Sequence, residues 1–280
     1  MDRRLNEAVF RGDVETIKKL IEEDSNIVEQ TLEGSLQHTI LHLAARLGHV
    51  ELVSEIVKLF PEMVSAENRD QETHLLEACR EGRVEIVRIL LENDPLVAYK
   101  TNLWDKSVFH VACERGRIEV VKHFLHNNMH MLLMLEVDMS TTSLHVAASS
   151  GDTDNEGRTP LHWAIIKGRV NIIAEILSVS LESAEMTTKH GETILHLAVK
   201  NNHFEVLKFL MESLDVSNLK NFQDADGNTI LHLVTVRKLT TEINGGNAQS
   251  NVDFYIIYDI SLYSCNMVNI APREGGIIGC

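Results

Sequence analysis

Apolar residues recur at intervals of three and four along five separate segments of the chain. This spacing places them on one side of an α-helix, so each segment is predicted to form a helix with one buried face. A glycine or asparagine begins each segment, and a shorter apolar stretch precedes it. The five segments span residues 48–59, 82–91, 116–125, 168–177 and 202–210. The pattern therefore predicts a succession of short paired helices.

The shorter stretch carries a repeated phrase, in which a threonine or serine is followed three residues later by histidine. Six copies begin at residues 39, 107, 142, 159, 193 and 229, and a copy that begins at Thr73 has leucine in the histidine position. Successive intervals are 34, 34, 35, 17, 34 and 36 residues. Such regularity indicates a repeat architecture, in which each unit packs mainly on its neighbours.

One interval is half the usual length. The phrase at 142–148 is followed almost directly by 152–158, which has the composition of the turn that leads into Thr159. We therefore predict that the repeat beginning near 142 lacks its second helix. The intervening residues are long enough for stacking to continue across it, with a gap in the layer of second helices.

These phrases, with the helices that follow them, resemble the ankyrin-repeat family over about residues 5–238. The resemblance implies an all-α solenoid of stacked helix-turn-helix units with β-turn fingers. It also implies that the threonine and histidine of each phrase share a hydrogen bond that fixes the start of the first helix. The predicted ankyrin-repeat domain spans 1–238, with an N-terminal cap at 1–38, and residues 239–280 form a non-repeat tail that we expect to be disordered.

Two linkers with a proline and an aliphatic residue, 60–66 and 93–98, are similar to those of plant ankyrin-repeat proteins that carry a C-terminal multi-pass membrane domain of the PGG type. That resemblance implies signalling in plant defence or stress response at the plasma membrane. Asp253 and Asp259 interrupt the apolar residues 252–270, so we expect no membrane span there and no membrane domain in this chain. The chain is expected to be cytoplasmic and to reach the plasma membrane only through a partner.

Charge and missing motifs narrow the function further. With 26 basic and 41 acidic side chains the net charge is −15, which disfavours nucleic acid and favours a protein partner with a basic segment. The sequence contains no phosphate-binding glycine loop, hydrolase elbow or zinc-protease helix, so we predict neither an enzyme nor a cofactor. The repeated histidines would lie about 10 Å apart, too far to share a metal ion.

In the ankyrin family, the fingers and first helices line the surface that binds other proteins. The candidate partner-binding residues on these elements are Arg69, Asp70, Trp104, Asp105, Lys106, Trp163, Lys189 and His190. Trp104 is either an exposed contact or folds onto the neighbouring finger, and Trp163 is expected to pack between repeats rather than touch a partner. Two functions remain open: a signalling scaffold of the plant type, and a soluble regulator of a transcription factor or another signalling protein.

Overall fold

The computed structural model describes residues 3–24, 27, 37–127, 153–216 and 219–235. Over these ranges the regular structure is helical, apart from one isolated bridge between Glu67 and Thr73. The predicted all-α architecture of paired helices is therefore confirmed. The chain divides into two compact units, Met1–His190 and Gly191–Cys280.

The described part of the first unit contains five helix pairs. The first helices of the pairs are α1 (Arg3–Arg11), α3 (Ile40–Leu47), α5 (His74–Glu81), α7 (Val108–Arg115) and α11 (Pro160–Ile166). The second helices are α2 (Val14–Glu23), α4 (Val50–Leu59), α6 (Val84–Asn93), α8 (Ile118–Lys122) and α12 (Val170–Val179). Shorter helical turns follow four of them: η2 (Pro61–Ser65), η3 (Pro95–Tyr99), the π-helical η4 (His123–Asn127) and η6 (Leu181–Glu185).

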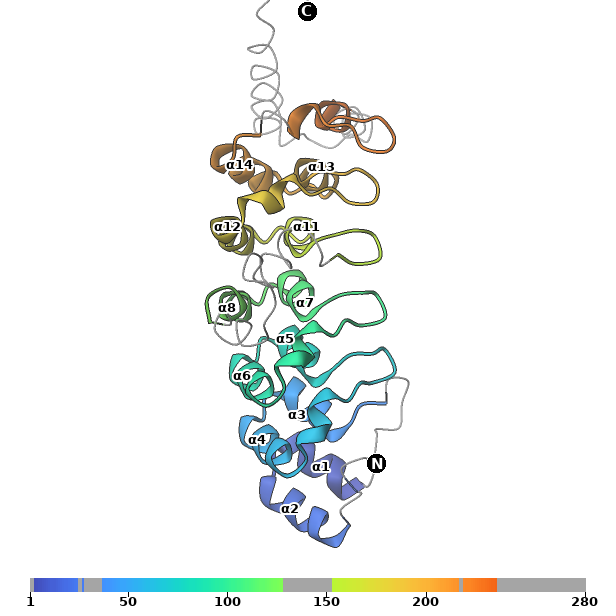
Figure 1. Cartoon of the computed structure of the whole chain (residues 1–280), viewed down its shortest axis with the longest axis vertical. Helices are drawn as coiled ribbons and strands as arrows, with labels where there is room; N and C mark the ends of the chain where they lie inside the picture. Colours follow the sequence, from blue (N-terminus) through green and yellow to red (C-terminus); the bar gives the residue numbers. More distant parts are fainter. Residues whose placement is uncertain (1–2, 25–26, 28–36, 128–152, 217–218, 236–280) are drawn as a thin grey trace, which may run out of the picture. The chain divides into compact units, whose positions relative to one another are not determined.

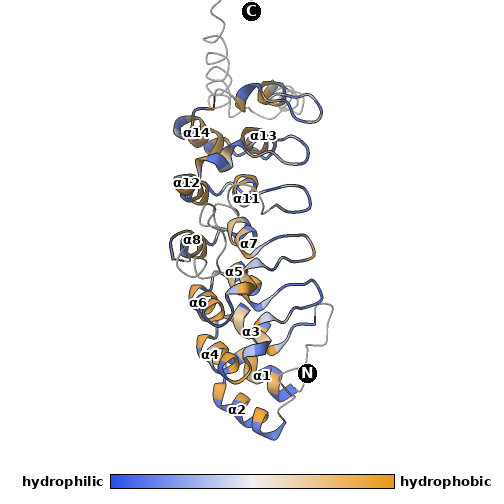
Figure 2. Cartoon of the chain, in the orientation of Figure 1, coloured by the Kyte–Doolittle hydropathy of each residue, from blue (hydrophilic) through white to orange (hydrophobic). Residues whose placement is uncertain are grey.

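The two sets of helices form two layers, and the loops project from the layer of first helices (Figure 1). Six consecutive residues of α3, from Ile40 to Ala45, are buried, because this layer is covered on both sides along the stack. α6 is amphipathic instead and buries Ile86, Val87, Leu90 and Leu91. Figure 2 shows the result: hydrophobic residues gather in the helices, and hydrophilic residues follow the projecting loops.

The phrase threonine and histidine set the start of each first helix and tie it to the next repeat. In α3, Nδ1 of His42 accepts a hydrogen bond from the backbone amide of Thr39 at 3.2 Å and lies 2.9 Å from its Oγ1, so the predicted link between the two residues is present. The opposite ring nitrogen, Nε2, donates to the carbonyl of Glu72 in the next repeat at 2.9 Å. A carbonyl only accepts, so the imidazole carries its proton on Nε2. Burial lowers the pKa of His42 to about 4, which keeps this ring neutral near pH 7.

The degenerate phrase at Thr73 uses a different histidine. His74, one residue after the cap, is fully buried and stacks against His42 with 3.9 Å between ring centroids. Its Nε2 lies 3.0 Å from Oγ1 of Thr39, and its Nδ1 donates to the carbonyl of Val64. The repeat that begins at Thr73 has leucine in place of the phrase histidine, and His74 joins it to the preceding repeat.

The repeats that begin at Ser107 and Thr159 stack directly on each other. α7 contacts α11, and α8 contacts α12. Nε2 of His110 donates a hydrogen bond to the carbonyl of Arg158, which lies 48 residues later. The equivalent bond of His42 reaches the carbonyl of Glu72, only 30 residues later. The difference, 48 − 30 = 18 residues, corresponds to extra chain inside this repeat.

The sequence predicts that a half repeat near 142 continues the stack, with a gap among the second helices. The direct contact of α7 with α11 differs from that expectation. Helices of neighbouring repeats bury their apolar sides on one another, and α7 already covers α11. Residues 128–152, which include the phrase at 142–148, lie outside the described residues.

The second unit repeats the pattern. It contains α13 (Ile194–Lys200), α14 (Phe204–Ser213) and the short η7 (Leu219–Asn221). Nδ1 of His196 lies 2.8 Å from Oγ1 of Thr193, and its Nε2 donates to the carbonyl of Asn228 at 2.9 Å. The final phrase, which begins at Thr229, has the same hydrogen bond to His232.

The predicted non-repeat tail, residues 239–280, lies outside the described residues. Cys79 and Cys113 are buried free thiols, as expected, and burial raises the pKa of Cys79. No helix in the described portion is long and apolar enough to cross a membrane.

Candidate functional site

The fingers are held by one polar residue at the same position of each repeat. Oδ1 of Asn102 accepts hydrogen bonds from the backbone amides of Trp104 and Lys106, at 3.0 and 3.1 Å. Oδ1 of Asp154 does the same for Glu156 and Arg158, at 2.9 Å each. Asn68 and Asp224 make equivalent pairs of bonds in their own fingers. The finger tips are therefore presented in a fixed conformation.

Two pairs of neighbouring fingers are also joined through their backbones. The amide of Leu103 donates to the carbonyl of Asp70 at 3.0 Å, and the amide of Lys189 donates to that of Glu156 at 3.1 Å. Between the fingers 102–106 and 154–158, which are both described, no backbone hydrogen bond is formed. This junction is the one that carries the 18 extra residues.

A hollow of about 510 Å³ lies at this open junction. Its lining includes both tryptophans of the chain, Trp104 from one finger and Trp163 from α11. Trp104 is 51% exposed, so of the two alternatives for this residue the structure shows the exposed one. The hollow is within the size range of sites that hold a small group or a few side chains.

Trp163 is fixed in the wall of the hollow by polar contacts. Its Nε1 donates to Oδ2 of Asp154 at 2.8 Å, the carboxylate whose other oxygen holds the finger. Nζ of Lys106 lies 3.7 Å from the ring centroid, and Lys106 also forms an ion pair with Glu114 at 2.7 Å. Cations favour the faces of an indole ring, so these contacts orient the ring as well as packing it.

A buried ion-pair network adjoins the hollow on the side of α5. Arg80 lines the hollow and forms ion pairs with Glu72 and Glu77, and Glu77 is also bonded to Arg46 at 3.1 Å. Burial raises the pKa of Glu72, but the hydrogen bond and charge of Arg80 outweigh it and leave the pKa below its usual value. This carboxylate is therefore ionised near pH 7, and the guanidinium of Arg80 is engaged.

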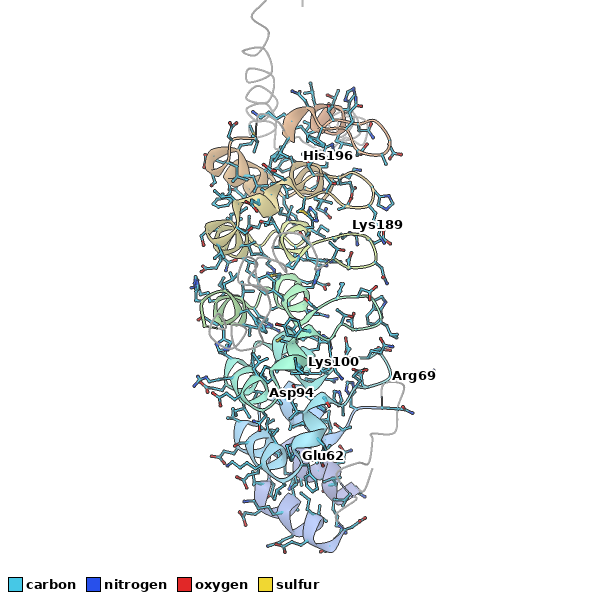
Figure 3. The ribbon with its side chains drawn as sticks, viewed as in Figure 1. Glu62, Arg69, Asp94, Lys100, Lys189 and His196 are labelled. Carbon is cyan, nitrogen blue, oxygen red and sulfur yellow. The ribbon has the colours of Figure 1, made fainter. Side chains whose placement is uncertain are left out.

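The structure brings three of the predicted site residues together, since Trp104, Lys106 and Trp163 all line the hollow. Asp105, in the same finger, has a left-handed backbone with φ of 54°. The remaining candidates lie on the two flanking fingers, where Arg69 and Lys189 project away from the second helices (Figure 3).

The flanking candidates make contacts of their own. The backbone carbonyl of Asp70 accepts a hydrogen bond from the backbone amide of Leu103. Lys189 donates from Nζ to the carbonyl of Asn155 at 2.7 Å, and His190 pairs with Glu156 at 3.2 Å.

Sequence reasoning missed nine of the residues that line the hollow: Arg80, Asn102, Val111, Glu114, Arg115, Asp154, Asn155, Glu156 and Arg158. Two of them have a positional signal, because Arg80 and Glu114 stand seven residues after Thr73 and Ser107, the first residues of their phrases. In the described part of the chain, no group of three histidine, cysteine or acidic side chains is placed to hold a metal ion.

Comparison with known proteins supports the repeat assignment. A family model for "Ankyrin repeats (3 copies)" matches residues 5–101, 150–219 and 173–240. The solved ankyrin repeat domain of Bcl-3, described as a unique member of the IkappaB protein family, superposes with a TM-score of 0.59 at 20% identity, covering 83% of this chain and 93% of that one. At that identity the likeness shows the fold alone.

Two curated relatives match over shorter stretches. Inversin from Gallus gallus is 40% identical over 62 residues, 22% of this chain and 6% of that protein. The nuclear factor NF-kappa-B p105 subunit from Rattus norvegicus is 27% identical over 79 residues, 28% of this chain and 8% of that protein. The chain thus matches less than a tenth of the length of either relative.

Proposed function

Because the chain belongs to the ankyrin-repeat family, we propose that it is a scaffold or adaptor that binds another protein at the hollow between the fingers 102–106 and 154–158. One observation carries this proposal: Trp104 is 51% exposed and lines a hollow that Trp163 also lines. Exposed tryptophans beside pockets contribute strongly to protein interfaces, since they bury a large area with few rotatable bonds.

The surface around the hollow is organised before a partner arrives. Asn102 and Asp154 each hold a finger with two backbone bonds, and Asp154 also holds the indole of Trp163. Binding then costs little ordering entropy on this side of the interface. The net charge of −15 attracts basic partner segments over long range, so association should weaken as salt rises.

Two biological settings fit such a scaffold. The proline-containing linkers support plant defence or stress signalling, with the chain in the cytoplasm and recruited to the plasma membrane by its partner. The match to the p105 subunit over 79 residues supports the alternative, a soluble regulator of a transcription factor or another signalling protein. Fractionation of native tissue separates the two: the first predicts recovery with plasma-membrane protein, and the second predicts recovery in soluble or nuclear fractions.

Affinity capture with the full chain tests the proposed surface. Trp104→Ala should lose partners that wild-type protein retains, whereas Leu103→Ala should keep them. Leu103 is a matched control, because it is the adjacent residue and is 49% exposed but does not line the hollow. If both variants recover the same partners as wild type, the binding surface lies elsewhere.

A further inference from the structure

We propose that the hollow accepts an acidic side chain, aspartate or glutamate, from an extended segment of the partner protein, with an apolar neighbour of that residue packed on Trp104. This inference rests on the proposed function and adds the chemistry of the ligand. It depends on the charges in the hollow, on which of them are already paired, and on the shape of its apolar wall.

The hollow has the opposite charge balance to the chain. Its lining contains four cationic and three acidic side chains, 4 − 3 = +1, whereas the whole chain carries −15. The cations are Arg80, Lys106, Arg115 and Arg158, and the acids are Glu114, Asp154 and Glu156. Lys167 adds a further cation nearby, with Nζ 5.5 Å from the Trp163 ring centroid.

The acidic groups of the lining are already engaged. Asp154 accepts from Trp163 through one oxygen and from two backbone amides through the other. Glu114 pairs with Lys106 at 2.7 Å, and Glu156 pairs with His190 at 3.2 Å. Asp154 and Glu114 are therefore not left to attract a basic ligand strongly.

Two of the cations, by contrast, have no carboxylate partner among the described residues. Nε of Arg158 is buried and makes no hydrogen bond with a described residue, and its guanidinium carbon lies 5.3 Å from the centroid of the Trp163 ring. Arg115, at the end of α7, is exposed, and no described carboxylate pairs with it. A buried donor without a partner is unfavourable, and a carboxylate is the acceptor that matches guanidinium geometry.

The apolar part of the hollow determines which kind of residue can lie next to the acidic residue of the partner. Trp104 presents about half of its surface, and the Trp163 ring is already covered on one face by Lys106. A volume of about 510 Å³ holds a glutamate and one neighbouring apolar side chain rather than a folded domain. Basic residues further along the same segment would still benefit from the negative charge of the chain.

A peptide selection tests the inference directly. A random peptide library displayed on phage is selected on the full chain, and clones that also bind Trp104→Ala are discarded. The remaining clones should carry aspartate or glutamate next to an apolar residue. In synthetic peptides made from these clones, replacing the acidic residue with its amide should raise the dissociation constant about ten-fold or more.

Variants of the protein assign that effect to the hollow. Arg158→Gln should weaken the acidic peptide and leave the amide peptide unchanged, so that the difference between the two peptides disappears. Arg115→Gln should reduce the same difference, and its exposed position protects the fold if Arg158→Gln proves unstable. Arg69→Gln, on another finger and outside the hollow, should preserve the full difference.

The outcomes separate the two proposals. Clones that depend on Trp104 but lack acidic residues, or carry basic ones in their place, overturn this inference and leave the proposed binding surface intact. An acid-to-amide difference that survives Arg158→Gln and Arg115→Gln also overturns it. If no clone depends on Trp104, the binding surface and the inference both fail.

Discussion

Nζ of Lys106 lies 3.7 Å from the centroid of the Trp163 ring and 2.7 Å from Oε2 of Glu114. Lys106 belongs to the finger of one repeat, and Trp163 to the first helix of the next. A cation over an indole contributes about 0.5–2 kcal/mol, depending on how far it is desolvated. Side chains therefore link the two repeats at a junction where the finger backbones are not bonded to each other.

The indole of Trp163 should contribute to stability as well as to binding. Trp163→Phe removes the donor to Asp154 but keeps a ring beneath Lys106, so we expect it to lower the free energy of unfolding by about 1 kcal/mol. Trp104→Phe should change it by less than about 0.5 kcal/mol, because Trp104 is half exposed. Urea unfolding of both variants measures the difference. Equal effects would contradict the structural role assigned to Trp163.

Gly116 should be intolerant of a side chain. Its φ is +75°, and a Cβ placed there would lie 2.9 Å from Nε of Arg169 in the following repeat. Gly116→Ala should therefore destabilise the protein by about 1–2 kcal/mol through its backbone conformation, and further through the displaced arginine. Gly227→Ala separates the two effects, because Gly227 has φ of +79° and nothing within 4 Å of the added carbon.

Thermal or urea unfolding of both variants makes the comparison. If Gly116→Ala is no more destabilising than Gly227→Ala, displacing the flexible end of Arg169 has no measurable cost and the backbone conformation accounts for the whole effect.

Acid should destabilise the histidine pair between α3 and α5. Burial lowers the pKa of His42 to about 4 and that of His74 well below its usual value, whereas both titrate near 6.5 when unfolded. The unfolded chain then binds more protons, so stability is complete above about pH 6.5 and falls as the pH approaches 4. For His42 alone the loss is on the order of 3 kcal/mol.

The measurement is the free energy of unfolding at several pH values between about 7 and about 4.5. His74→Gln removes one of the two groups and should make the decline shallower. Arg69→Gln, on an exposed finger tip and without a group that titrates in this range, is the control and should leave the slope unchanged. A slope identical in all three proteins would show that the buried pair does not titrate as described.

The sequence was sufficient for the fold because one local rule is repeated. Each phrase places a hydroxyl at the cap and a histidine three residues later, and the hydrogen bond between them depends only on the start of a helix, as at Thr193 and His196. Trp104 was found in the same way, because the repeat alignment shows which residues stand at a finger tip.

The site itself was only partly predictable, because it depends on which repeats are neighbours. Trp163 was expected to pack between repeats, and its half-buried ring does so, but it also forms one wall of the hollow. The hollow depends on the contact of α7 with α11, which brings Arg158 and Asp154 into the same lining as Lys106. His74 was missed for a related reason: it bonds to a residue 35 positions earlier rather than within its own phrase.

The extra chain between α8 and α11 should be removable. From Asn127 to Asp154 there are 154 − 127 − 1 = 26 intervening residues, whereas from Asn93 to Asn102, at the equivalent place in the previous repeat, there are 102 − 93 − 1 = 8. The difference is again 18. Deleting residues 131–148, a stretch of 18, should therefore restore the usual spacing and leave α7 packed on α11.

We expect this deletion variant to keep its helical circular dichroism and to unfold at no lower urea concentration than wild type, since a shorter connection between α8 and α11 costs modestly less entropy to close. An 18-residue deletion of 75–92 is the control: it removes most of α5 and α6 and should abolish cooperative unfolding, because neighbouring repeats lose their buried faces. If the deletion of 131–148 is equally damaging, residues in that stretch are needed for the stack, and the direct packing of α7 on α11 does not account for its stability.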